Sequence, residues 1–393
     1  MPASKSQSRL GTYVTSSLAG ERVRAFIPPP LPPTPEVDLS GLHQKLDRAN
    51  QGLGRLNGMT RLLPDVRFLL YLYVRKEALL SSQIEGTQSS FTDLLLFENE
   101  AVTKVPIEDV EEVSNYVAAM QHGLRRLAGG FPLSLRLIRE IHGILLKGGR
   151  GANKMPCEFR RTQNWIGGTR PGNALFVPPP PERLMECLDG LERFLHDERH
   201  RLPVLVEAGL VHVQFESIHP FLDGNGRVGR LLITLLLCSK GVLIEPLLYP
   251  SLYLKTNRSR YYDLLQRVRT DGVWEDWLAF FLEGIATAAQ EAADTAERTL
   301  RLFAGDRKKV EQLGRAASSA LRVQELMQRN PYIRIRTAAR ALKLTIPTVT
   351  SALNHLVRLG IVNEVSGKRR DRLFAYSRYV NMVSQGTEPV SIP

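Results

Sequence analysis

Twelve residues near the middle of the chain combine side chains suited to phosphate chemistry. The segment HPFLDGNGRVGR runs from His219 to Arg230. Its DGNG turn needs residues that readily adopt positive φ, and the apolar run after it predicts a buried helix. Consecutive N–H groups at the start of such a helix form a preorganised anion site, suited to phosphate. We therefore expect an anion hole at Gly224, Asn225 and Gly226.

The side chains around this turn suggest specific chemical roles. Arg227 and Arg230 are three residues apart, so they share a helix face and both can reach an anion. Asp223 precedes the turn, where a carboxylate beside a polyphosphate commonly recruits Mg²⁺. His219 is the candidate general base, because imidazole alone in this segment has a free pKa near neutrality. Phe221 should pack inward and hold the loop.

Three simpler interpretations fit the segment less well. A calcium loop would place Phe221 and Leu232 at ligand positions, where neither can bind the ion. A P-loop needs a Gly-Lys-Ser/Thr ending, which is absent. A plain helix cap with incidental charges would rarely bring so many chemically suited residues together in order.

The segment resembles the signature of the Fic family, H-x-F-x-[D/E]-G-N-G-R-x-x-R, at every specified position. Family members are α-helical and mostly transfer AMP from ATP to a hydroxyl side chain of a target protein. The resemblance implies that His219 deprotonates the target hydroxyl and that Asp223 binds Mg²⁺. It further implies that Arg227 binds the terminal phosphates and Arg230 the γ-phosphate, with ATP and Mg²⁺ as cofactors.

Two further segments resemble parts of that family. EFRRTQNWIGGTRPGNALFVPPPP has the turn residues of a β-hairpin and resembles the flap that pins the target backbone by β-augmentation. This implies that Ile166, Gly167 and Gly168 lie near the nucleotide or the target.

SRYYDLL resembles the segment that contacts adenine. This resemblance implies Tyr262 as the contact and Tyr261 as its neighbour. Some relatives carry an asparagine seven residues after the second tyrosine. Arg269 stands there in this chain, so that contact is not transferred.

The stretch SSQIEG suggests inhibition. Ser81 and Glu85 are four residues apart on a predicted helix and share a face. With Gly86 they match the family's inhibitory motif [S/T]-x-x-x-E-[G/N]. Its place before the active-site motif is that of the subgroup inhibited by an N-terminal helix. The resemblance implies that Glu85 pairs with Arg230 and blocks productive binding of ATP.

The sequence pattern predicts helices over most of the chain, and we expect four regions along it. An N-terminal region with a proline strap (FIPPPLPPTP) and the inhibitory helix covers residues 1–100. A helical Fic-type core with the β-hairpin flap covers residues 101–286. A linker helix follows over residues 287–317, and a small domain over residues 318–385.

The last part has the pattern of a winged helix-turn-helix domain. Helix, short helix, turn, helix and two strands follow in order, with Thr345 or Thr348 as candidate caps and GKRRDR as the wing. The whole chain has a net charge of +12, and residues 321–379 hold twelve basic residues against three acidic ones. This concentration of charge makes DNA a candidate partner.

Bulk composition indicates a soluble, cytoplasmic protein. The three cysteines match no metal pattern, which indicates reduced thiols. The N-terminus lacks a secretory signal, and the run LLITLLLC is too short to span a membrane. A homodimer is expected by family resemblance.

The sequence thus predicts a mainly α fold and an autoinhibited protein adenylyltransferase that modifies a Ser, Thr or Tyr hydroxyl of a target or of itself. One alternative is a Fic enzyme that transfers another phosphate-containing group. Kinase-like relatives carry a lysine in place of the second glycine of the anion hole, whereas Gly226 keeps it open and favours AMP transfer. Removal of AMP is another. A third is a DNA-binding regulator with the Fic core as its sensor.

Overall fold

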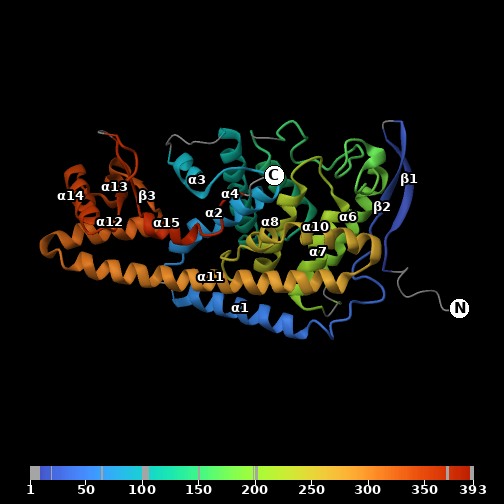
Figure 1. Cartoon of the computed structure of the whole chain (residues 1–393), viewed down its shortest axis with the longest axis horizontal. Helices are drawn as coiled ribbons and strands as arrows, with labels where there is room; N and C mark the ends of the chain where they lie inside the picture. Colours follow the sequence, from blue (N-terminus) through green and yellow to red (C-terminus); the bar gives the residue numbers. More distant parts are fainter. Residues whose placement is uncertain are drawn as a thin grey trace.

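The computed structural model describes residues 9–389, except 19, 63–64, 100–105, 149–150, 198, 200–201 and 369–370. It is mainly helical, and two small sheets lie at opposite ends of the elongated molecule (Figure 1). The elements up to residue 311 are β1 Thr12–Leu18, β2 Glu21–Ile27, α1 His43–Leu62, α2 Arg67–Ile84, α3 Phe91–Glu98, α4 Ile107–Ala128, α5 Leu135–Leu145, α6 Pro181–His196, α7 Val204–Ile218, α8 Asn225–Ser239, α9 Ser251–Thr256, α10 Arg258–Asp271 and α11 Trp274–Glu311.

Helices α7 and α8 form the centre of the core, as their apolar composition predicts. Every residue of α7 after Val204, from Leu205 to Ile218, is buried, and α8 is buried from Val228 to Leu237. Helix α8 packs on α7 and α4, and α2 packs on α4 and α9. These contacts place the end of α7, the start of α8 and the end of α2 around one site.

Helix α11 is a single helix of 38 residues that forms the long axis of the molecule. Helix α1 lies along it over most of its own length (Figure 1). Helix α11 runs without a break across the boundary expected at residue 286, so linker and core share one element. The expected domain boundaries remain predictions.

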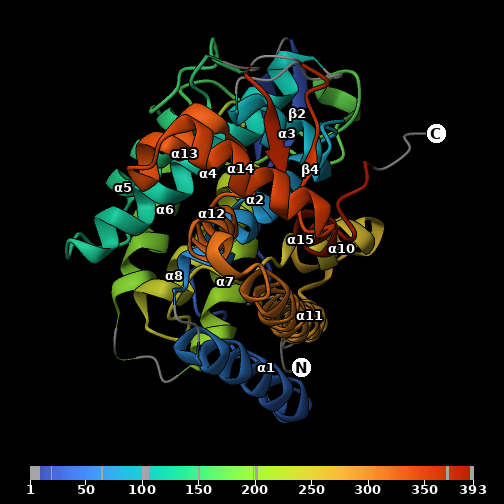
Figure 2. The same cartoon turned by 90° about the vertical axis from the view of Figure 1, so that its left-hand side faces the viewer.

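The residues after α11 form a C-terminal unit that packs on α2 and α11 (Figure 2). Thr345 caps α14, because its hydroxyl accepts a hydrogen bond from the Thr348 N–H. The two arginines at the wing tip, 369 and 370, lie outside the described residues, and the winged-helix assignment remains a prediction. The elements of this unit are α12 Ala317–Arg329, β3 Tyr332–Arg334, α13 Ile335–Leu342, α14 Ile346–Arg358, β4 Asn363–Glu364, β5 Leu373–Ala375 and α15 Ser377–Val383, with the strand order β3-β5-β4.

Two β features differ from the prediction. An antiparallel hairpin of β1 and β2, paired from Thr12 with Ile27 to Leu18 with Glu21, was not expected. The flap, expected as a β-hairpin, contains only an isolated bridge between Ile166 and Phe176. A 3₁₀ turn over residues 171–173 and positive φ at Gly167 and Gly168 interrupt longer strand pairing there.

Candidate active site

The predicted anion turn joins α7 to α8 in a fixed conformation. His219 ends α7 with φ of 50°, and Gly224 precedes α8 with φ of 78°, a region that glycine tolerates best. The buried Asn225 side chain closes the turn. Its Oδ1 accepts from the Phe221 N–H and its Nδ2 donates to the Phe221 carbonyl oxygen, both at 2.8 Å. Asn225 thus holds the turn with its side chain, which leaves its backbone N–H at the helix start.

Neighbouring segments hold the same loop. The buried Arg160 donates from Nε to the His219 carbonyl oxygen at 2.9 Å. The ring of His142 stacks on Phe221 with centroids 3.7 Å apart, and its Nε2 lies 3.1 Å from the Asp223 carbonyl oxygen. Phe221 is fully buried, as expected for a residue that anchors the loop. The positive φ of His219 is therefore supported from both sides.

A cavity of about 520 Å³ opens beside the turn, between α7, α10, the flap and the end of α2. It brings together six residues that the sequence analysis selected, namely Glu85, Ile166, His219, Gly226, Arg230 and Tyr262. The remaining residues that line it are Leu175, Phe176, Glu216, Arg258, Leu265, Gln266 and Arg269. One wall is apolar and the other is charged, a combination that suits a nucleotide.

Other selected residues do not line the cavity. Tyr261 is fully buried, and its hydroxyl lies 2.8 Å from His212 Nε2. Its role is therefore packing beside Tyr262, which is exposed. Gly167 and Gly168 shape the flap but contribute no cavity wall. Asn164, which the sequence analysis did not select, ties the flap to the loop by donating to the Phe221 carbonyl oxygen at 3.1 Å.

The electrostatics keep His219 neutral. Burial lowers its pKa to about 3, and the nearby cations Arg269 and Arg160 add to that effect, while Glu85 opposes it. Its Nδ1 has no hydrogen-bond partner among the described residues. With this pKa the imidazole is unprotonated at physiological pH and its ring nitrogen is free to accept a proton, as a weaker base than free imidazole.

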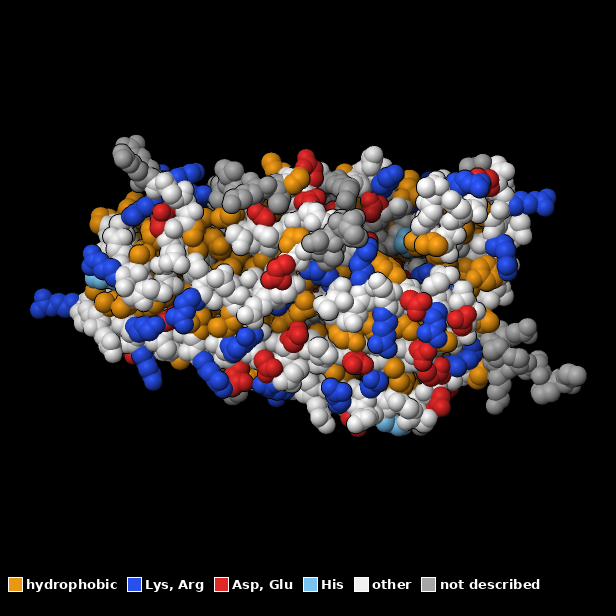
Figure 3. Space-filling view, in the orientation of Figure 1, with side chains coloured by type: hydrophobic (Ala, Val, Ile, Leu, Met, Phe, Trp, Pro, Cys, Tyr) orange, Lys and Arg blue, Asp and Glu red, His pale blue; other side chains and the backbone are white. Residues whose placement is uncertain are grey.

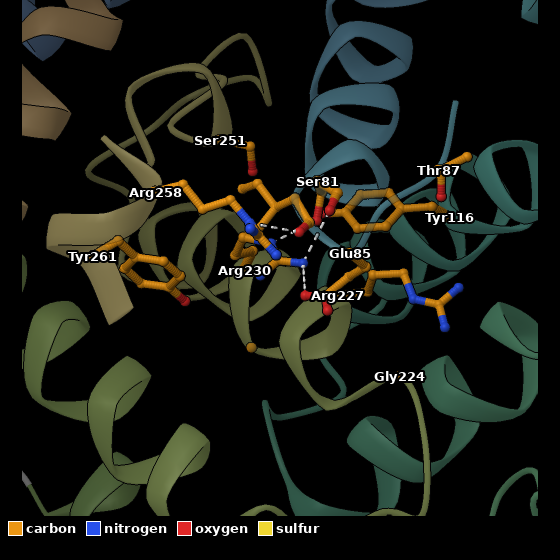
Figure 4. A network of polar contacts seen from close by, with 12 residues as sticks. Ser81, Glu85, Thr87, Tyr116, Gly224, Arg227, Arg230, Ser251, Arg258 and Tyr261 are labelled. Atoms are coloured by element: carbon orange, nitrogen blue, oxygen red, sulfur yellow. Dashed lines mark hydrogen bonds and ion pairs between the residues drawn. The ribbon is translucent and has the colours of Figure 1, made fainter. Parts of the chain in front are cut away.

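Arg230 is occupied by the end of α2. Its Nη2 lies 2.6 Å from Glu85 Oε1, and its Nε donates to Ser81 Oγ at 2.9 Å (Figure 4). Burial would raise the Glu85 pKa, but Arg230 outweighs it, so the pKa is lowered and the carboxylate is charged. A Cβ on Gly226 would lie 2.3 Å from Glu85 Oε1, so a glycine there makes room for this acid.

The backbone conformation of Gly86 accounts for the glycine at the last position of the inhibitory motif. Its φ is 100°, in a range that favours glycine. This conformation ends α2 directly after Glu85. Arg258 of α10 then donates to the Ile84 carbonyl oxygen at 3.1 Å, which fixes the helix end against the cavity wall.

Arg227 points away from Arg230 (Figure 4). Its Nη1 lies 3.0 Å from Glu112 Oε1 and its Nη2 lies 3.3 Å from Asp223 Oδ1, and Arg227 and Glu112 are both buried. The Thr87 hydroxyl donates to Glu112 Oε1 at 2.9 Å. In this structure the two arginines therefore have different partners, because α4 supplies a carboxylate that the sequence pattern does not show. Their expected binding of one anion remains a prediction.

Asp223 suits a magnesium ion that also binds phosphate. Its carboxylate is partly exposed, and its Oδ1 accepts from the Gly224 N–H at 2.5 Å. Among the described residues there is no group of three or more His, Cys, Asp or Glu side chains that could hold a metal. One carboxylate is the protein contribution expected for Mg²⁺ that retains water and phosphate oxygens.

Several residues of the site escape sequence reasoning. Glu216 lines the cavity, burial raises its pKa to about 7, and its Oε1 has no hydrogen-bond partner among the described residues. Arg269 stacks on Phe176 at 3.9 Å and donates to the Glu216 carbonyl oxygen at 3.1 Å. Only the tertiary fold reveals these contacts. The one sequence signal is the position of Arg269 seven residues after Tyr262.

Comparison with known proteins finds similarity to the Fic/DOC family in two segments of the chain. The model described as Fic/DOC family matches residues 132–237, and that described as Fic/DOC family N-terminal matches residues 43–125. The chain is 31% identical over 223 residues to the protein adenylyltransferase Fic of Drosophila grimshawi, covering 56% of this chain and 41% of that protein. It is 32% identical over 225 residues to the protein of the same name from Culex quinquefasciatus, covering 56% and 39%. The chain is thus similar to the Fic/DOC family over these two segments and distantly similar to proteins named protein adenylyltransferase.

The structural comparison agrees on the fold. A Fic family protein from Desulfovibrio desulfuricans superposes with a TM-score of 0.55 at 18% identity, over 85% of this chain and 96% of that chain. The prediction of a mainly helical Fic fold is confirmed. The chain spans less than half the length of the two curated relatives, so their activity is not established for it by similarity. None of the described helices combines the length and apolar character that crossing a membrane requires.

Proposed function

We propose that this protein is an autoinhibited adenylyltransferase that transfers AMP from ATP to a hydroxyl side chain of a target protein or of itself. The cavity beside the α8 N-terminus would receive the nucleotide, with its phosphates at the N–H groups of Gly224, Asn225 and Gly226. The observation that carries this proposal is the neutral His219 in the same cavity as the α8 N-terminus and Arg230.

The reaction would be a displacement at the α-phosphorus. The target hydroxyl gives its proton to His219 while its oxygen forms the new P–O bond. The bond from the α-phosphorus to the bridging oxygen breaks, and pyrophosphate leaves. When bound, Mg²⁺ at Asp223 would neutralise phosphate charge. The flap backbone beside Ile166 would pair with the target backbone, because the N–H and C=O groups of Ile166 itself already bond to Leu175 and Phe176.

Autoinhibition would follow from the Glu85–Arg230 pair. A charged, buried guanidinium already paired with a carboxylate at 2.6 Å cannot also hold the γ-phosphate. Entry of ATP in its productive pose would therefore require Glu85 to leave. Because Glu85 lies in the cavity, it could also orient water for removal of AMP. Intact-mass analysis of a modified target would detect that activity.

The experiment incubates wild type, Glu85→Gly, His219→Ala and the double variant Glu85→Gly/His219→Ala with labelled ATP and Mg²⁺ in lysate. Labelled proteins are then identified by mass spectrometry. We expect at least tenfold more label with Glu85→Gly than with wild type, and background label with Glu85→Gly/His219→Ala. This change corresponds to about 1.4 kcal/mol of inhibition. Equal labelling by wild type and Glu85→Gly would contradict autoinhibition. Labelling that persists without His219 would contradict its role as base. Parallel reactions with labelled UTP test another donor.

A second candidate function is DNA binding by the C-terminal unit. Lys and Arg side chains lie over the end of the molecule that carries α12 to α14 (left in Figure 3). Thr350 and His355 on α14 are polar positions of the helix that would enter the major groove. We expect duplex binding that weakens steeply with salt and weakens further in Arg369→Ala/Arg370→Ala. Absence of duplex binding at low salt would remove this candidate.

A further inference from the structure

Both ends of the helix that carries Glu85 are held by residues of the C-terminal unit. At the start of α2, Asp65 Oδ2 lies 3.0 Å from Arg329 Nε of α12. One turn further, the Tyr379 hydroxyl of α15 donates to the Phe68 carbonyl oxygen. Helix α15 lies beside α2 in Figure 1. The helix that blocks the cavity is thus anchored to the C-terminal unit by contacts between residues more than 260 positions apart in sequence.

The other end of α2 is held by the segment after α15, residues 384–388. Gln83 is buried, and its Nε2 donates to the Thr387 carbonyl oxygen at 2.9 Å and to the Ser89 carbonyl oxygen at 3.0 Å. Thr387 is only 4% exposed. Segment 384–388 therefore contacts the last turn of α2 through its buried Thr387, whereas Gln385, Gly386 and Glu388 are exposed.

Lys255 of α9 completes this contact. Its Nζ donates to Gln83 Oε1 at 2.7 Å and also to the carbonyl oxygens of Gly386 and Glu388. One ammonium group thus joins α2, α9 and segment 384–388. Lys255 does not line the nucleotide cavity, so this cluster is separate from the residues proposed to bind ATP.

The position of Gln83 links this cluster to inhibition. Gln83 lies between Ser81 and Glu85, which both contact Arg230. A shift of the last turn of α2 that carries Glu85 away from Arg230 would break the bonds of Gln83. Each such bond therefore favours the inhibited position.

We propose that segment 384–388 is a latch that holds α2 in its inhibitory position, so that the C-terminal unit sets how strongly the enzyme is inhibited. This inference rests on the proposed function. An event that moves the C-terminal unit would loosen both ends of α2 together and release Glu85.

Two full-length variants break the latch from opposite sides. Lys255→Ala removes the shared ammonium group. Gly386→Val acts within the segment, because Gly386 has φ of 81° and a Cβ there would lie 2.9 Å from Leu252 Cδ1. We expect each to raise AMP transfer roughly fivefold over wild type, as loss of about 1 kcal/mol of inhibition implies. Lys45→Ala is the matched control, because it removes a lysine ion pair with Glu283 between α1 and α11.

Two readouts separate the latch from the proposed function. In the Glu85→Gly background the latch variants should add no activity, because the inhibitory carboxylate is already gone. Hydrogen–deuterium exchange over residues 77–90 should be faster in Lys255→Ala and Gly386→Val than in wild type and Lys45→Ala. Exchange unchanged in both latch variants would overturn the latch, whatever the activity. An inactive Glu85→Gly with faster exchange in the latch variants would instead overturn only the proposed function.

Discussion

At the residue scale, the chemistry of the cavity depends on charge states that the fold sets. Burial and the neighbouring Arg269 and Arg160 keep His219 neutral, whereas Arg230 keeps Glu85 charged. His219 is unprotonated, whereas Arg230 is already paired with Glu85. Inhibition would therefore act on nucleotide binding rather than on proton transfer. Glu85 and Arg230 thus determine access, and His219 determines reactivity.

The lowered pKa of His219 predicts an unusual pH profile. An imidazole with a free pKa near 6.5 would lose about fourfold of its neutral form between pH 7.5 and 6. With a pKa of about 3, His219 should lose almost none. Glu85→Gly removes the one carboxylate that raises the pKa of His219, so this pKa stays lowered in the active variant. We expect kcat/KM of Glu85→Gly to fall less than twofold over this range.

Glu216 provides the control for that profile. Its pKa of about 7 places its titration inside the measured range, and it lines the same cavity. A fall in kcat/KM that disappears in Glu85→Gly/Glu216→Gln belongs to Glu216. A fall of about fourfold that persists there would show that His219 titrates near its ordinary pKa, against the prediction.

At the element scale, the end of α2 controls the cavity through one backbone conformation. Gly86 has φ of 100° in open space, so an added Cβ meets no atom but the backbone is strained. Gly86→Ala should cost roughly 1–2 kcal/mol in this conformation and raise basal AMP transfer about fivefold to tenfold. Gly86→Asn should stay close to wild type, because asparagine tolerates positive φ better. Equal activities of Gly86→Ala and wild type would contradict the prediction.

The elements and the site differ in how far the sequence predicts them. The apolar spacing of α5, α7 and α8 and the prolines before α6 and α7 determine helices locally, so these are predictable. The contiguous motif from His219 to Arg230 carries its own turn. Arg160, Glu112 and Thr87 reach the site only through packing between distant segments, and no short pattern encodes such contacts.

The same distinction explains the two β features. The hairpin of β1 and β2 has a buried face on β2 with Val23, Ala25 and Ile27. Phe26 on the opposite face is buried as well, so the alternation is weak, and a proline strap follows directly. In the flap, glycines and a 3₁₀ turn replace the regular pairing that its turn residues suggest. A single bridge leaves most of the Ile166 segment unpaired within the described flap. This would suit a segment that pairs with a target instead.

At the scale of the whole molecule, α11 connects the inhibitory helix to the C-terminal unit. Asp306 on α11 is 1% exposed, and its Oδ2 accepts from the Tyr376 hydroxyl at 2.8 Å. Its Oδ1 also lies 2.8 Å from Lys309 Nζ and 3.4 Å from Arg378 Nη1. One buried carboxylate therefore fixes the start of α15, and segment 384–388 follows α15 directly.

Asp306→Asn should loosen this anchor without touching the cavity. A hydrogen bond to a charged group contributes about 1.5–3 kcal/mol, so we expect a lower unfolding temperature. If the latch depends on α15, basal AMP transfer should rise in the same variant, and the rise should vanish in the Glu85→Gly background. Asp294→Asn is the matched control, since Asp294 lies on the same helix but forms a partly exposed pair with Arg55. A destabilised Asp306→Asn with wild-type activity would show that the C-terminal unit and α2 respond independently, because the anchor would then have failed without freeing Glu85.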